Sequence, residues 1–323
     1  MKFNKITGVI GILISGFIIW YLIEYIDIRV TWYTVRSVSF YYPTIMIGIY
    51  LSTFPLRTWR WKLLLKYSPN IEWFSVLNGL IVGFAGNNIL PARAGELLRM
   101  QYLSKKESLG RVGILTSILV EKIVDALVLS SFLFVVSFFF LKEIDSEVVF
   151  KQSLFVLLIV LVFTILLVVY FIKKNELILL FVRSYGGKFS SRIDSFLHRI
   201  YESLAIVKLD IDGLKVLALS FLIWTMEGLV FVTGIYAVGI HESFFLIGFL
   251  TLCIVNFSIL IPSSPGYIGV FQAAFIFAFS IFKIDKNAGL AAALLVHACQ
   301  FLPITLWGIL FFFINAFSFK NDK

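Results

Sequence analysis

A chain of 323 residues that is 60% hydrophobic and only 15% charged carries more apolar side chain than a water-soluble domain could cover. The mean hydropathy of +0.95 therefore indicates an integral membrane protein. The long apolar runs favour spanning helices and exclude the short alternating strands of a membrane barrel. The net charge of +9 fits the excess of Lys and Arg on the cytoplasmic side of membrane proteins, and we expect no nucleic-acid partner.

Apolar windows long enough to cross the hydrocarbon core follow one another along the chain. They are expected at residues 6–23, 41–58, 71–91, 112–141, 150–172, 213–238, 243–261, 265–282 and 287–316. The first is interpreted as a retained span, because it is long and lacks a small-residue cleavage site. The polar connection from 173 to 212 is expected to contain a surface helix. The sequence thus predicts one all-α membrane domain over residues 1–323.

Most Lys and Arg residues fall on one side if the window 71–91 enters and leaves the membrane on the same side. This bias predicts a multi-pass protein of the cell membrane with both termini in the cytoplasm. Three scattered histidines and two cysteines in apolar runs form no metal-ligand pattern. No metal and no cofactor are therefore expected.

The first break in an apolar window lies in GFAGNNILPARAGELLRM, residues 83–100. Pro91 removes a backbone donor, and the freed backbone groups must be buried in protein or line a wet cavity. A helix end inside the membrane favours an anion, and Arg93 and Arg99 lie just past the break. Together with Asn88 and Gly95, which allows close backbone approach, these arginines are candidate ligands for a lipid head group.

A second break lies in LIPSSPGY, residues 260–267, where Pro262 and Pro265 interrupt the helix. Ser263, Ser264 and Gly266 offer hydroxyl donors and a flexible backbone, so they are further head-group candidates. The break carries no charge of its own.

The two breaks share the pattern of a proline followed, after three residues, by a glycine. Further on, GILTSILVEKIVD (113–125) aligns with GLAAALLVHACQF (289–301), which sets Glu121 opposite His297. With the orientation above, the first half begins inside and the second outside. The sequence therefore predicts an inverted-topology repeat with two broken or re-entrant segments, in halves of about 1–141 and 150–316.

Ionisable residues inside the apolar windows are the remaining candidates. Glu121 and Asp125 are four residues apart and share a helix face, so a cation must offset their repulsion. Lys122, or the arginines past the first break, could supply it. One reading is that Lys122 simply neutralises Asp125 near the end of a long helix; the other is a cavity that binds phosphate. Glu96 and Glu227 join this charge network, and Glu227 is either protonated and inert or part of proton coupling.

Three stretches, NNILPARAGELLRM, EKIVD and IPSSPGYIGVFQ, together resemble the flippase-like transmembrane domain of the lysylphosphatidylglycerol synthase family. Lys122 stands where that family usually has Arg, which costs the bidentate fork that suits phosphate. Gln272 stands where the family often has Glu. The resemblance implies a stand-alone lipid transporter without the aminoacyl-transferase domain of the full synthases. Its substrate would be an anionic phospholipid, a glycolipid or a polyprenyl-phosphate-linked lipid.

Two other functions stay open at this point. A membrane-embedded transferase or hydrolase would act on lipid phosphate, but no catalytic residue is assigned, because no Ser-His-Asp set or Asp-rich metal motif occurs in the sequence. A non-transporting accessory subunit would partner a lipid-modifying transferase. Homo-oligomerisation is also left open.

Overall fold

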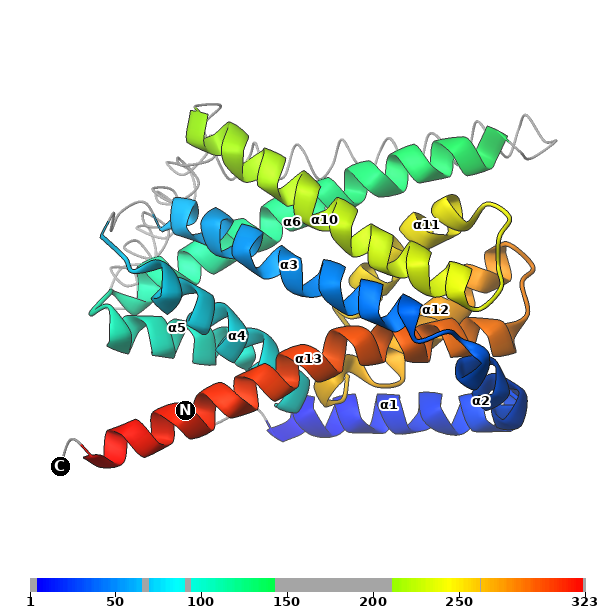
Figure 1. The fold of residues 1–323 in the computed structure, drawn as a ribbon, viewed down its shortest axis with the longest axis horizontal. Helices are drawn as coiled ribbons and strands as arrows, with labels where there is room; N and C mark the ends of the chain where they lie inside the picture. Colours follow the sequence, from blue (N-terminus) through cyan, green and yellow to red (C-terminus); the bar gives the residue numbers. More distant parts are fainter. Residues whose placement is uncertain (1–4, 66–69, 91–93, 143–210, 262, 322–323) are drawn as a thin grey trace, which may run out of the picture. The chain divides into compact units, whose positions relative to one another are not determined.

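The structure is a computed structural model that describes residues 5–65, 70–90, 94–142, 211–261 and 263–321 (Figure 1). Every regular element in these ranges is a helix, so the predicted all-α membrane fold is confirmed. The helices are α1 (Lys5–Tyr25), α2 (Ile28–Ser37), α3 (Tyr41–Leu64), α4 (Trp73–Ile89), α5 (Gly95–Lys106), α6 (Arg111–Lys142), α10 (Ile211–Ala237), α11 (Phe244–Ser258), α12 (Val270–Ile281), α13 (Lys286–Asn321) and the 3₁₀ turn η3 (Pro265–Tyr267).

Each predicted apolar window inside the described ranges forms a helix with similar bounds. The window 150–172 and the predicted surface helix between 173 and 210 lie outside those ranges. By length and composition, α10 and the Lys286–Ile314 part of α13 can each cross a membrane. The pair formed by Gly11–Tyr25 of α1 and by α2 passes the same test together, but it bends by 89° at the break between them.

The end of one helix and two short helices differ from the prediction. Helix α3 continues to Leu64, six residues beyond the expected end at 58, and Pro55 lies inside it. A proline and two arginines lower the hydropathy there, yet both arginines are buried and the helix persists. Helices α2 and α5 were not predicted, because both lie between the apolar windows and are mixed in polarity.

The chain divides into two compact units. Unit 1 comprises Met1–Phe54, Leu80–Arg99 and Thr225–Lys323, and unit 2 comprises Pro55–Gly79 and Met100–Trp224. Helices α3, α4, α5 and α10 contribute one part to each unit. The unit boundary does not follow the predicted repeat halves, and the single domain with two halves stays a prediction.

Both predicted breaks coincide with gaps between helices. Helix α4 ends at Ile89 and α5 begins at Gly95, whereas α11 ends at Ser258 and α12 begins at Val270 with η3 between them. Pro91 and Pro262 lie outside the described residues, and Pro265 is the first residue of η3. In each half a 12-residue helix, α5 or α12, follows the break and a long helix, α6 or α13, comes next.

Candidate functional site

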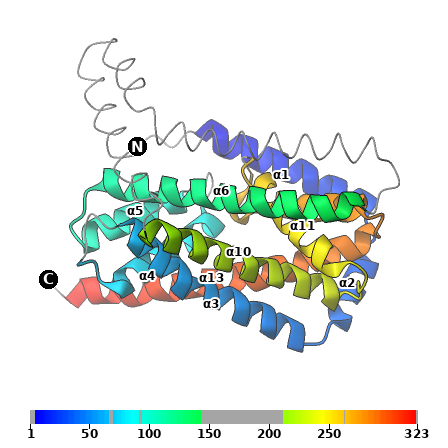
Figure 2. The same cartoon turned by 90° about the horizontal axis from the view of Figure 1, so that it is seen from above.

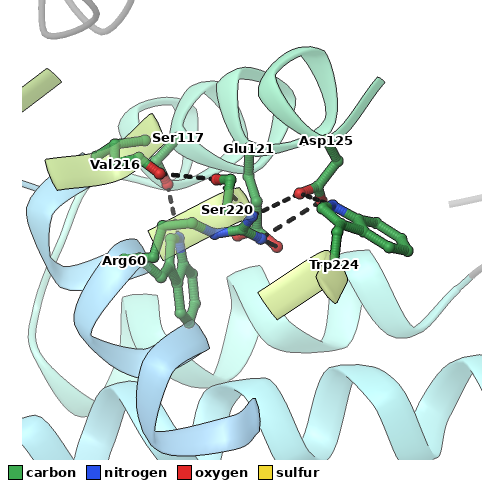
Figure 3. A network of polar contacts seen from close by, with 8 residues as sticks. Arg60, Ser117, Glu121, Asp125, Val216, Ser220 and Trp224 are labelled. Atoms are coloured by element: carbon green, nitrogen blue, oxygen red, sulfur yellow. Dashed lines mark hydrogen bonds and ion pairs between the residues drawn. The ribbon is translucent and has the colours of Figure 1, made fainter. Parts of the chain in front are cut away.

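Three helices of unit 2 direct polar side chains toward one buried arginine (Figure 3). Arg60 comes from α3, Glu121 and Asp125 from α6, and Ser220 and Trp224 from α10. On α6 and on α10 the residues are four apart, so each pair lies on one face of its helix. The described side chain of Arg60 is fully buried, at 0% exposure.

The guanidinium of Arg60 binds both carboxylates. Its Nη1 donates to Asp125 Oδ1 at 2.5 Å and its Nη2 lies 3.4 Å from Asp125 Oδ2, an arrangement that approaches the bidentate fork. Nη2 also lies 3.3 Å from Glu121 Oε1. Ser220 Oγ accepts a second bond from Nη1 at 2.9 Å, and the indole nitrogen of Trp224 donates to Asp125 Oδ1 at 2.8 Å.

Neighbouring hydrogen bonds fix the positions of these groups. The Ser220 hydroxyl donates to the Val216 carbonyl at 2.8 Å, which leaves its lone pairs to Arg60. One residue along α3, the Trp61 indole donates to Ser117 Oγ at 2.9 Å and so ties α3 to α6 beside the arginine. The site is therefore held by bonds to groups outside the ion pairs as well as by the ion pairs themselves.

Two features separate this network from an ordinary salt bridge. The Nε–H of Arg60 has no hydrogen-bond partner among the described residues, although it is buried. Arg57, one turn earlier on α3, is also buried and places its guanidinium carbon 5.9 Å from the centre of the Trp224 ring. Buried charges and a buried open donor are costly, so the network points to function rather than to stability alone.

In unit 1 the helices on either side of the first break, α4 and α5, pack closely against each other through their backbones. A Cβ on Gly95 would overlap the carbonyl oxygen of Gly83 and the backbone nitrogen of Asn87, so only glycine fits there. The side chain of Arg99 packs over Gly83, whose built Cβ would lie 3.0 Å from that of Arg99. Arg99 is consequently buried, with 2% of its surface exposed.

A residue beside each break contacts α13. Asn88, at the end of α4, donates through its amide nitrogen to Thr305 Oγ1 at 2.8 Å and to the Phe301 carbonyl at 3.3 Å. Gly266, in the second break, has a φ of +67°. A Cβ there would come within 2.6 Å of the Phe301 ring and 3.2 Å of the Asn88 carbonyl oxygen. Glycine is therefore required at Gly266 by both conformation and space.

Other polar residues on α13 hold the elements around the second break. His297 Nδ1 lies 3.0 Å from the amide nitrogen of Gln272, whose Oε1 accepts the backbone N–H of Gly269 at 2.8 Å. One turn further along α13, Gln300 donates to Glu227 Oε2 on α10 at 2.7 Å. These buried bonds tie α10, α12 and α13 together.

The sequence matches the family described as the lysylphosphatidylglycerol synthase TM region over residues 8–308. The chain belongs to this family.

Three relatives illustrate what this chain is similar to. A UPF0104 membrane protein of Methanocaldococcus jannaschii is 26% identical over 244 residues, which cover 73% of this chain and 98% of the relative. A UPF0104 membrane protein of Archaeoglobus fulgidus is 26% identical over 306 residues, 88% of this chain and 90% of the relative. Glycosyltransferase AglD of Haloferax volcanii is 25% identical over 285 residues, 78% of this chain but 45% of that protein.

The structure brings together part of the predicted charge network. Glu121 and Asp125 do share a buried face of α6, and the cation against both of them is Arg60, which the sequence analysis did not single out. Lys122 is exposed. The alternative that Lys122 alone neutralises Asp125 therefore misses the buried guanidinium bound to that carboxylate. In the sequence Arg60 is the second of two arginines three residues apart directly after an apolar run, a pattern that hydropathy assigns to a loop.

The head-group candidates around the breaks are distributed differently. Arg93 lies outside the described residues. Glu96 is half-buried in the first turn of α5, where the helix dipole favours an acidic side chain. The Ser264 backbone N–H donates to Ser15 Oγ on α1 at 2.9 Å, and a Cβ on Gly11 of α1 would lie 2.7 Å from the Ser263 carbonyl oxygen. This serine turn thus packs against α1.

Proposed function

We propose that this protein moves an anionic lipid between the two leaflets of the cell membrane. The head group would pass buried polar residues while the acyl chains stay in the bilayer. The observation that carries the proposal is the fully buried guanidinium of Arg60, bound to two carboxylates inside a membrane protein and with one N–H open among the described residues. An intramembrane charge of this kind is a functional candidate by default.

A phosphate group can replace a carboxylate on an arginine, because the planar fork of donors matches both anions. An incoming phosphate would compete with Asp125, the more exposed of the two carboxylates at 10% against 2%.

The arginines past the first break, Arg93 and Arg99, and the exposed Lys122 remain proposed contacts for the head group. The proposed charge-coupling residues remain Glu96 and Glu227 besides the two carboxylates of α6. Asn88 is a weaker candidate, because bonds to α13 already occupy its amide nitrogen. Among the three substrate classes, the relative named as a glycosyltransferase favours a sugar-bearing lipid.

The test is lipid transport in vesicles that contain the purified protein. Fluorescent analogues of phosphatidylglycerol, phosphatidylcholine and a polyprenyl-phosphate sugar report translocation when an added membrane-impermeant reductant bleaches only the outer leaflet. Loss of one charge-assisted contact to phosphate corresponds to about 10- to 100-fold in rate. We expect Arg60→Gln to lower transport of the anionic lipids by that factor, and Arg60→Lys to keep part of it.

The matched control is Arg111→Gln, which removes the same charge from the exposed first residue of α6. It is expected to change transport less than two-fold. If folded Arg60→Gln protein transports anionic lipids as fast as the wild type, the arginine does not serve the head group and the proposal loses its basis.

A second function is favoured by the alignment with the glycosyltransferase. Because this chain matches 45% of that protein, it could act as the membrane partner of a separately encoded transferase without transporting lipid itself. This alternative predicts that a soluble glycosyltransferase co-purifies with the protein and that the isolated protein moves no lipid in vesicles. Transport by the isolated protein would exclude it.

A further inference from the structure

The short helix α2 leaves α1 at nearly a right angle. The bend of 89° lies at Ile26 and Asp27, the two residues that separate the helices. Along α1 the large apolar side chains of Leu13, Phe17 and Trp20 are more than half exposed, as expected of a helix that faces lipid. A helix perpendicular to such a span runs along the membrane surface and not through it.

Helix α2 lies against α13 within unit 1 (Figures 1 and 2), and hydrogen bonds hold it in this orientation. Asp27 caps the helix, since its Oδ1 accepts from the backbone N–H of Arg29 at 2.8 Å and of Val30 at 3.2 Å. The Asp27 N–H donates to Asn287 Oδ1 at 2.9 Å, at the start of α13. Asn287 in turn donates to Asp285 at 2.9 Å. The corner between α12 and α13 therefore fixes the position of α2.

The outer face of α2 carries two arginines between aromatic rings. Arg29 and Arg36 are seven residues apart, so they lie on one face about 10 Å apart along the axis. Trp32 and Tyr33 lie between them in sequence and are 54% and 78% exposed. The Arg36 guanidinium carbon is 5.0 Å from the centre of the Trp32 ring. Exposed Arg, Trp and Tyr together are typical of the head-group level of a bilayer.

We propose that α2 lies in the head-group layer and that Arg29 and Arg36 bind the phosphate groups of anionic lipids there. Asp27 stays at the start of the helix, where its carboxylate caps two backbone N–H groups, and α2 itself contains no acidic residue, so Arg29 and Arg36 carry the charge of the helix. This lipid contact is separate from transport, because it involves lipid that stays in its own leaflet. It anchors the end of α1 and the α12–α13 corner at the membrane surface.

Quenching of Trp32 fluorescence tests the proposal locally. The protein is placed in phosphatidylcholine vesicles that contain either brominated phosphatidylglycerol or brominated phosphatidylcholine, with bromine near the head group. The contribution of Trp32 is the difference between the wild type and Trp32→Phe. We expect stronger quenching by the anionic lipid, with a preference of up to about 30-fold in affinity, since each basic residue at an anionic surface contributes about 5-fold.

Two charge variants decide the origin of the preference. Arg29→Gln/Arg36→Gln should reduce it to near unity, and Arg29→Lys/Arg36→Lys should retain most of it. Lys105→Gln/Lys106→Gln removes the same charge from exposed positions at the end of α5 and should leave the preference unchanged.

Three results would overturn the proposal. The first is no brominated-lipid quenching at Trp32, and the second is an unchanged preference after loss of both arginines. The third is an equal loss of preference in Lys105→Gln/Lys106→Gln, which would assign the effect to the overall charge of the protein. None of these measurements depends on whether the protein transports lipid.

Discussion

Replacing Arg60 by glutamine should destabilise the protein through charge imbalance, not through lost volume. At 3.3 Å from Glu121 and an effective dielectric constant of about 20, the attraction is about 5 kcal/mol, and the contact with Asp125 adds a term of similar size. The cost of burying the ions offsets much of this sum. Breaking a buried pair by removing one partner costs about 3–5 kcal/mol, and we expect Arg60→Gln to fall in that range.

Removing all three charges should reverse most of that loss. In the variant Arg60→Gln/Glu121→Gln/Asp125→Asn no carboxylate is left without a cation, and the Trp224 indole can still donate to the amide oxygen at position 125. Neutral replacements of a whole buried ion network are often close to neutral in stability. We therefore expect the free energy of unfolding of the triple variant to lie within about 1–2 kcal/mol of the wild-type value. We also expect this variant to transport no anionic lipid.

Denaturation in detergent micelles, followed by circular dichroism, gives the free energies of unfolding. Vesicle transport of the same preparations gives the function. A triple variant as unstable as Arg60→Gln alone would show that the loss comes from packing or hydrogen bonding, and the charge argument would be wrong. A stable triple variant that transports at the wild-type rate would instead show that these charges play no part in moving the head group.

Three further predictions concern the helix breaks, and thermal unfolding in detergent checks each of them. Gly95→Ala should cost about 1–3 kcal/mol because its Cβ has no space, whereas Gly16→Ala, with nothing within 4 Å, should be neutral or stabilising. Gly266→Ala should cost more than Gly239→Ala, since both have positive φ but only the first has close neighbours, and equal costs would show that conformation alone matters. Thr305→Val should cost about 1–3 kcal/mol by leaving the half-buried Asn88 amide on α4 short of an acceptor, and no loss would mean that water replaces the hydroxyl.

Local sequence rules predicted the two helix breaks and the pair of carboxylates that share one face of α6. A proline followed by a glycine inside an apolar run is a local signal for the end of a helix, so the gaps before α5 and α12 could be predicted. The spacing of Glu121 and Asp125 fixed their shared face in the same way. Both inferences need only the residues within a turn or two of the chain.

The partner of those carboxylates could not be found by such rules. Arg60 follows Pro55 at the edge of an apolar window, and hydropathy alone gives that pattern to a cytoplasmic loop. Its burial depends on α6 and α10, which bring Asp125 and Ser220 to it from 65 and 160 residues away. A long-range contact of this kind leaves no periodic signal in a single sequence. The same holds for Trp224, whose indole completes the coordination of Asp125.

The aligned positions of the two predicted halves can be compared for what each residue contacts. Gly95 and Gly266 align, and both occupy places where a Cβ would collide with the chain. Glu121 and His297 also align, but their chemistry differs, because Glu121 binds a buried arginine whereas His297 contacts the amide of Gln272. In the predicted repeat, both halves thus have a glycine with no room for a Cβ, whereas buried charge at the second aligned position occurs in the first half. A head group transported as we propose would meet the buried arginine in the first half, whereas in the second half the aligned position makes a hydrogen bond between His297 and Gln272.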